Sequence, residues 1–482
     1  MSRDQQCARG TISVVAAGFL ATGLIIQSLS GKAAADPGDY NFTVLARIPG
    51  PAPGGGRFDL DFEPYAINGN GSAAFVADLK VANQDIGEGV FVSRQGQLLQ
   101  IARAGQPAPG GGTFDGGALG HTPLNDAGSG AFVYILEVEP PPPQTLIGLN
   151  AGLYRFSLLS RTPTAVVVPG VTTAPTGGTF KGVYYDTSLN NSGDLVFGGI
   201  VPGSAGPPGS NGLEVGVFKA SSNNNIVPIV VPGDPAPGGR VFDDGFNAWI
   251  NDLGDVAFEA HVKGDECINF GSDLLCGSSI YKKKKSGEIQ SIAHQGDPAP
   301  AGGTYRFAFA PVMNNAGDLV FIGDLTPAPD SLQTLGVFSF NSTTSMTSPV
   351  AVPGDALPGG GRFKTASRWT YTSYLNNVGD ITFVARLEPV GGDGVGDTGL
   401  YLVSRGKPQL VARTGSTIPG VGIIAQINPP GNISPPSPFF SPEAASDIWL
   451  GGAINDQGQI FFEATLPGGT GVLLAATPRT PR

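Results

Sequence analysis

The sequence predicts an all-β chain whose repeats close into a ring, and three observations support this. Glycine and proline, 73 and 42 of 482 residues, punctuate a chain that is still 40% hydrophobic and only 14% charged. That composition indicates many tight turns around a real apolar core and does not favour disorder. The phrase Asn-x-x-Gly-x-x-x-Phe recurs seven times, each time after a Pro/Gly turn. Four strand-like segments fit each repeat, so we expect a seven-bladed β-propeller of four-stranded antiparallel blades.

The repeat is the strongest signal in the chain. Its copies begin at Asn68, Asn125, Asn190, Asn251, Asn314, Asn376 and Asn455, at spacings of 57, 65, 61, 63, 62 and 79 residues. The last spacing is long because residues 428–446 are inserted there. A β-solenoid is the alternative, but its repeats are usually much shorter.

The four expected strands, A to D, follow from the pattern within each repeat. Strand A ends at the asparagine, and NxxG predicts a tight turn, because Asn and Gly tolerate the left-handed backbone that hairpin turns require. Strand B, such as DVAFEAHV at 255–262, is apolar on both faces, so we expect neighbouring blades to cover both. Strand C carries a Gly-apolar-aromatic phrase, and strand D runs into the next Pro/Gly turn.

The two ends of the chain are complementary halves of one blade. Residues 41–48 have the pattern of a D strand with no blade before it, and GVLLAATP at 471–478 is a C strand with no D strand after it. We therefore expect the first segment to pair antiparallel with residues near Val472 and Ala475. This pairing would close the ring and bury Phe42, Val44 and Leu45.

The N-terminus predicts export. Arg3 and Arg9 precede an apolar segment at 11–29, and Ala33 to Ala35 offer a cleavage site of small residues. We assign 1–35 to a signal peptide, 36–478 to the propeller domain and 479–482 to a C-terminal tail. A retained membrane anchor is the alternative. The expected location is secreted, extracellular or in the cell envelope.

Charge limits the partners of the mature chain. Removing Arg3, Arg9, Lys32 and Asp4 leaves 25 basic and 38 acidic residues. This acidity argues against nucleic acid, and against membrane contact beyond the signal segment. We expect a monomer.

Two cysteines, Cys267 and Cys276, follow the predicted cleavage site. A close pair in an exported chain predicts a local disulfide. No histidine lies near them at ligand spacing, so we predict no metal site.

The repeat resembles that of bacterial exported proteins described by the tandem phrase N-x-x-G-x-x-A-F, found with varied surface anchors. The alanine is present at Ala74, Ala131 and Ala257, and is replaced at Val196, Val320, Thr382 and Phe461. The strand order is also similar to WD40 and TolB-type propellers. The resemblance spans nearly all of the mature chain and implies export and repeat architecture, with no established activity.

Aspartates flank many of the predicted turns. They are Asp194, Asp255, Asp318 and Asp380 after NxxG turns, and Asp234, Asp297 and Asp355 before proline turns. We expect them to accept hydrogen bonds from local N–H groups, with calcium binding as the alternative. No other cofactor is expected.

The tryptophans are the candidate ligand-binding residues. Trp249, Trp369 and Trp449 all fall near or in strand A, which lines the channel of a propeller. An aromatic ring there could stack on a sugar or a peptide, and core packing is the alternative. The three histidines, His121, His261 and His294, show no sequence arrangement that suggests a triad or metal centre.

The B–C connections differ in every repeat, and variable loops on a rigid scaffold are common recognition sites. We therefore expect a binding or scaffold module for extracellular glycan or protein. The alternative is a propeller enzyme that acts on polysaccharide through acidic residues such as Asp61, Asp186, Asp243 and Asp244. A glycosidase would need two carboxyl groups about 5 to 10 Å apart.

Overall fold

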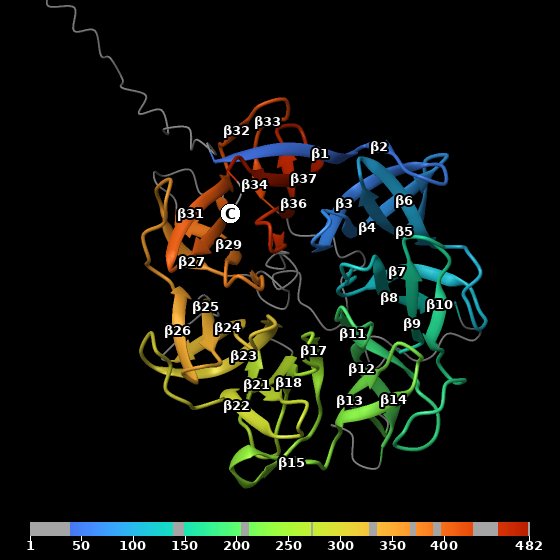
Figure 1. Cartoon of the computed structure of the whole chain (residues 1–482), viewed down its shortest axis with the longest axis vertical. Helices are drawn as coiled ribbons and strands as arrows, with labels where there is room; N and C mark the ends of the chain where they lie inside the picture. Colours follow the sequence, from blue (N-terminus) through green and yellow to red (C-terminus); the bar gives the residue numbers. More distant parts are fainter. Residues whose placement is uncertain are drawn as a thin grey trace, which may run out of the picture. The chain divides into compact units, whose positions relative to one another are not determined.

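Seven antiparallel β-sheets follow one another around a ring in the computed structural model of this chain (Figure 1). The structure describes residues 39–137, 149–203, 212–270, 273–326, 335–366, 373–388, 397–427 and 452–480. Nearly every repeat supplies one sheet from consecutive strands, which confirms the predicted β-propeller.

The strands of the seven blades are as follows. Blade one has β2 (Gly50–Pro51), β3 (Arg57–Ile67), β4 (Ala73–Val81), β5 (Gln84–Arg94) and β6 (Gln97–Arg103); blade two has β7 (Phe114–Leu119), β8 (Ser129–Leu136), β9 (Ala151–Ser157) and β10 (Thr164–Val167). Blade three has β11 (Gly182–Leu189), β12 (Leu195–Pro202), β13 (Leu213–Ala220) and β14 (Ile226–Val230); blade four has β17 (Phe246–Ile250), β18 (Val256–Ala260), β21 (Ser279–Lys283) and β22 (Ile289–Ala293). Blade five has β23 (Thr304–Met313), β24 (Leu319–Thr326), β25 (Leu335–Asn341) and β26 (Met346–Ala351). Blade six has β27 (Arg362–Thr365), β28 (Ser373–Leu375), β29 (Ile381–Glu388), β30 (Thr398–Ser404) and β31 (Lys407–Arg413); blade seven has β34 (Gln426–Ile427), β35 (Ala453–Ile454), β36 (Ile460–Leu466), β37 (Thr470–Pro478) and β1 (Tyr40–Ile48).

Both faces of strand B are covered, as the sequence predicts. In β18, Phe258 belongs to an apolar cluster that includes Val196 of blade three. Its neighbour Ala257 belongs to the next cluster, with Phe321 of blade five. Alternate side chains of one strand therefore pack on different neighbouring blades, which is why the strand has no polar face.

Each of the first six blades contains a stacked pair of rings that explains two repeat positions. The phenylalanine of the repeat stacks on the aromatic residue of strand C, with centroids 5.4–6.0 Å apart and ring planes 21–27° apart. In five of these blades a glycine two residues before that aromatic leaves room for the ring, since a Cβ at Gly89 would lie 2.7 Å from the ring of Phe91. In blade four Ser279 is at this position. In blade seven Phe462 instead pairs with Leu474.

The N-terminal strand completes the last blade. β1 pairs antiparallel with β37, with Thr43 opposite Ala475 and Arg47 opposite Val472 (Figure 1, blue beside red). This confirms the predicted closure and its register. The predicted burial is only partly right, because Phe42, Val44 and Leu45 are half-buried. A bulge between Val44 and Ala46 changes which side chains of the strand point toward the core. The fully buried residues are Tyr40, Ala46 and Ile48.

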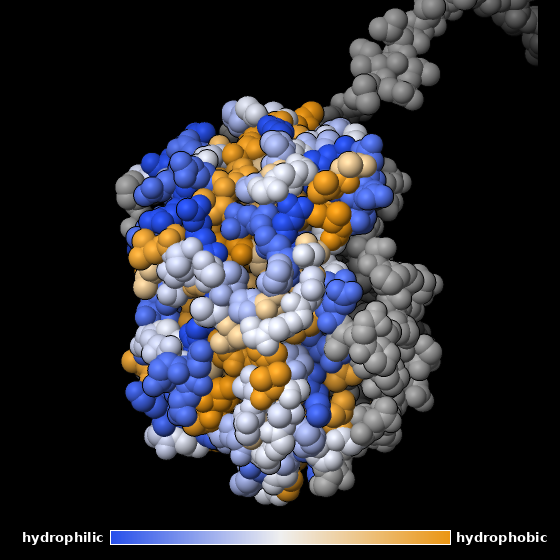
Figure 2. Space-filling view, turned by 90° about the vertical axis from the view of Figure 1, so that its right-hand side faces the viewer, coloured by the Kyte–Doolittle hydropathy of each residue, from blue (hydrophilic) through white to orange (hydrophobic). Residues whose placement is uncertain are grey.

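On the face shown in Figure 2, hydrophobic residues form small separate patches among hydrophilic residues. These patches do not join into one apolar surface. Among the described residues, no helix is long and apolar enough to cross a membrane. Trp369, Trp449, the signal segment and most of the variable B–C connections lie outside the described residues.

Candidate functional site

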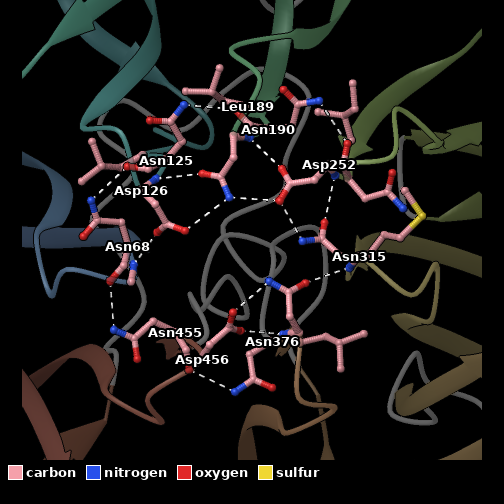
Figure 3. Close-up of a pocket in the computed structure, with 18 of the residues that line it drawn as sticks. Asn68, Asn125, Asp126, Leu189, Asn190, Asp252, Asn315, Asn376, Asn455 and Asp456 are labelled. Carbon is pink, nitrogen blue, oxygen red and sulfur yellow. Dashed lines mark hydrogen bonds between the residues drawn. The ribbon is translucent and has the colours of Figure 1, made fainter.

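The seven repeat asparagines form a closed ring of hydrogen bonds around the channel. Figure 3 labels Asn68, Asn125, Asn190, Asn376 and Asn455 of this ring. Each side-chain Nδ2 donates to the backbone carbonyl oxygen of the equivalent asparagine in the next blade. The seven N···O distances run from 2.9 to 3.4 Å, and the bond from Asn455 to Asn68 closes the circle. All seven side chains are buried.

The same asparagines also hold their own turns. Each Oδ1 accepts the N–H four residues later at 2.8–2.9 Å, as Asn251 does from Asp255. A side-chain amide supplies this donor and this acceptor together, whereas a carboxylate of the same shape could only accept. The predicted NxxG turns are present, and each has left-handed backbone at the glycine. The turn glycine, such as Gly254 at φ 86°, takes that conformation, and Asn251 does not.

A second ring, formed by the residue after each asparagine, lies at the mouth of the channel. Around the ring these residues are Gly69, Asp126, Asn191, Asp252, Asn315, Asn377 and Asp456. From Gly69 to Asn377, each backbone N–H donates to the Oδ1 of the next member at 2.6–2.9 Å. We call this set the rim. It carries three carboxylates.

Side-chain amides of the rim bridge the carboxylates. Nδ2 of Asn191 lies 3.2 Å from Oδ2 of Asp126 and 3.0 Å from Oδ2 of Asp252. Asn377 donates in the same way to Asp456 at 3.0 Å. The positions of the three carboxylates are therefore fixed before any ligand arrives.

Beneath the rim lies a pocket of about 160 Å³. The residue that precedes each asparagine gives it an apolar collar, consisting of Ile67, Leu124, Leu189, Ile250, Met313, Leu375 and Ile454. Trp249, one residue further back along β17, also lines it. No lysine or arginine is among the described residues of the lining.

Trp249 lies where three blades meet across the channel. Its ring centroid is 5.1 Å from that of His121 in blade two and 6.4 Å from that of Tyr374 in blade six. These blades are not neighbours, so their side chains can touch only across the central channel. Of the three rings, that of Trp249 is the one that lines the pocket, and the other two are buried behind it. A ligand role for Trp249 stays a prediction, as it does for Trp369 and Trp449.

The turn aspartates bond to nearby backbone. Asp255 accepts the N–H of Lys285 at 2.9 Å, Asp318 that of Ser342 at 2.7 Å, and Asp234 that of Val231 at 3.0 Å. These contacts agree with the predicted local role. Calcium binding is not tested by them.

The four proposed catalytic carboxylates have different partners. Asp61 hydrogen-bonds to Asp78, and burial together with this bond and the charge of Asp61 raises the pKa of Asp78 to about 9. Asp186 accepts the N–H of His121 at 2.9 Å, and the N–H of Asp243 donates to the carbonyl oxygen of His261. A hydrogen-bonded carboxyl pair is closer than the separation a glycosidase needs.

The sequence did not reveal that two histidines have aspartate partners. Nδ1 of His261 lies 2.7 Å from Oδ2 of Asp244, and Nε2 of His294 lies 3.4 Å from Oδ1 of Asp265. Burial lowers the pKa of His261, but the charge and hydrogen bond of Asp244 outweigh it and the net pKa is raised. The antiparallel pairing of strands A and B was the available signal, because Phe246 pairs with Glu259 and Phe242 with Val262, which brings Asp244 near His261.

The two cysteines occupy paired positions in the backbone register of a small hairpin. β19 (Cys267–Phe270) pairs with β20 (Asp273–Cys276), and the register sets Cys267 opposite Cys276. The covalent bridge between them stays a prediction.

The fold and its channel define this chain as a seven-bladed β-propeller with a pocket at the channel mouth. The chain belongs to the family described as "Family of unknown function (DUF7453)", which it matches over residues 67–299 and 271–473. No curated protein matches the sequence.

Solved structures similar to this chain are propellers of low identity. An oligogalacturonate lyase in complex with manganese is 12% identical, with 87% of this chain and 96% of that chain covered and a TM-score of 0.43. The β-propeller domain of the trilobed protease from Pyrococcus furiosus is 8% identical, with 88% and 97% covered and a TM-score of 0.44. TolB from Acinetobacter baumannii is 12% identical, with 73% and 62% covered and a TM-score of 0.39. At these values the likeness implies no shared activity.

Proposed function

We propose that this protein is an exported binding or scaffold module that takes an extracellular glycan or protein ligand at the mouth of its propeller channel. The observation that carries the proposal is the layered pocket itself, with a polar rim, an apolar collar and Trp249 at the inner end. A concave site into which a few fixed polar groups converge is a common form of ligand pocket.

Rigidity also supports binding. The asparagine ring fixes the walls and the rim bonds fix the carboxylates, so little side-chain freedom remains to be lost when a ligand enters. Preorganised groups bind with a smaller entropic cost than mobile ones. The rim aspartates already accept backbone and amide N–H bonds, which suits recognition better than proton transfer.

Glycan and peptide arrays probed with the full mature chain would test this function. We expect ligands whose signal falls in Trp249→Leu and is kept in Leu253→Ala, which alters an exposed side chain of the same blade outside the pocket lining. Thermal unfolding of both variants would show that they fold. A hydrolysis assay on the bound glycans separates binding from the enzyme alternative. An array without any Trp249-dependent ligand would contradict the proposal.

A further inference from the structure

We propose that His294 is a pH-dependent latch that holds the base of the hairpin formed by β19 and β20. This hairpin belongs to the variable B–C connection of blade four, so the proposal is independent of the channel-mouth site. The turn after β22 holds the hairpin's base. Nε2 of Gln295 donates to the carbonyl oxygen of Glu266 at 3.0 Å, and Oε1 of Gln295 accepts the N–H of Glu266 at 2.7 Å. The residues that precede these two, His294 and Asp265, lie beside each other.

The pair of His294 and Asp265 is buried and incompletely bonded. Their side chains are 3% and 8% exposed, and Nε2 of His294 lies 3.4 Å from Oδ1 of Asp265. Nδ1 of His294 lies 2.7 Å from the carbonyl oxygen of Gln295, which can only accept, so Nδ1 carries a proton. In the neutral imidazole, Nε2 therefore turns a lone pair toward a carboxylate. Neither Nε2 nor Oδ2 of Asp265 makes a hydrogen bond within the described part of the chain, so a proton on Nε2 converts a repulsive contact into an ion pair.

Blade six has a permanent charge at the same position of the repeat. Arg413 lies two residues before a turn glycine, as His294 does, and the backbone N–H of each donates to the side chain three residues later, at 3.0 and 3.1 Å. Nη2 of Arg413 lies 3.1 Å from Oδ2 of the buried Asp397. Arginine stays charged in proteins, whereas histidine loses its charge near neutral pH. Of these two equivalent contacts, pH can therefore break the one in blade four.

The surroundings of His294 favour its protonated form on balance. Asp265 is the largest influence and raises the pKa of His294, while burial and the positive charge of Arg240 lower it. The net pKa lies above the ordinary value of 6.5. The latch therefore contributes fully below pH 6.5 and is lost as pH rises through the pKa of the folded state. The titratable and charged groups placed around the imidazole are Asp265, Asp297, Arg240 and Tyr281.

Hydrogen exchange of the full mature protein at pH 6 and pH 8 tests the latch. We expect the protection factors of the amides in β19 and β20, corrected for the intrinsic exchange rate at each pH, to be about threefold to tenfold lower at pH 8. His294→Arg should give high protection at both pH values, because arginine keeps its charge, and His294→Gln should give low protection at both. His261→Gln, which alters the other histidine–aspartate pair of this blade, is the matched control and should keep the wild-type pH dependence. Thermal unfolding would show that each variant folds.

Equal protection of β19 and β20 at pH 6 and pH 8 in the wild type would overturn the proposal, and that comparison requires no variant. A midpoint at or below pH 6.5 for the imidazole of His294, followed by NMR, would also overturn it. If His294→Gln keeps the wild-type pH dependence, another group is responsible and His294 is not the latch.

Discussion

The side-chain amide of Asn455 donates a 2.9 Å hydrogen bond to the backbone carbonyl oxygen of Asn68, 387 residues away. This contact joins the last blade to the first, and it has the same geometry as the six contacts between consecutive blades. The ring of asparagines is therefore closed on the channel side, while β1 and β37 close the sheet itself. Two independent devices hold the ends of the propeller together.

The asparagine ring predicts that replacing one of its asparagines by aspartate lowers the stability of the protein. We expect Asn251→Asp to lower the free energy of unfolding by about 1–3 kcal/mol, because the carboxylate keeps the acceptor role, loses the donor and buries a charge. Denaturant unfolding measures the loss. Asn341→Asp is the matched control, since the exposed Asn341 side chain acts only as an acceptor in the described contacts. Equal small losses in both variants would contradict a structural role for the ring.

The fold could be predicted from sequence more completely than the site. The asparagine phrase and the unpaired end strands determined the blade number and the closure, since both are local patterns repeated at fixed spacing. The rim could not be foreseen, because Asp126 and Asp252 acquire meaning only when their turns meet around one axis. Trp249 was found as a channel residue, but its contacts with His121 and Tyr374 join three separate repeats.

Ring closure predicts that the N-terminal strand is essential. Deleting residues 36–48 should lower the melting temperature and promote aggregation, because β37 would lose its ladder bonds, at about 1 kcal/mol each, and expose its edge. Light scattering during thermal unfolding measures both effects. Deletion of residues 480–482 is the control, since it leaves β37 intact. A monomeric, cooperative transition at an unchanged temperature after the first deletion would contradict the closed ring.

The export prediction concerns residues outside those the structure describes. We expect material secreted by the intact gene to begin near Asp36, because the small residues Ala33 to Ala35 suit signal cleavage. N-terminal sequencing of the secreted protein, with intact mass as a second measurement, would show this. A mature chain that keeps residues 12–29 would show a retained anchor instead.

The hairpin register predicts a disulfide between Cys267 and Cys276. Closing so short a loop contributes about 2–3 kcal/mol in the chain-entropy model, and we expect it to order the hairpin more than the ring. Thiol counting on unfolded, unreduced secreted protein should find both cysteines blocked. Replacing both by serine should leave the main unfolding transition of the blades little changed. Two free thiols in freshly secreted protein would refute the bridge.

The buried carboxyl of Glu259 leads us to expect that the folded protein loses stability as pH rises. Its Oε1 accepts the N–H of Ala310 in blade five at 2.6 Å and Nδ2 of Asn247 at 2.9 Å, and burial raises its pKa from 4.5 to about 7 despite these bonds. The folded protein therefore binds this proton more tightly than the unfolded chain does. The contribution of Glu259 to the free energy of unfolding should fall between pH 4.5 and 7, by on the order of 3 kcal/mol, and remain low above that range.

The variant Glu259→Gln keeps an oxygen acceptor for both donors and cannot ionise, so it should be more stable than the wild type at pH 8. Other buried carboxyls, such as Asp78, titrate in both proteins, so the difference between wild type and variant at pH 5 and at pH 8 isolates Glu259. If that difference is the same at the two pH values, the carboxyl of Glu259 is not buried in the way the structure shows.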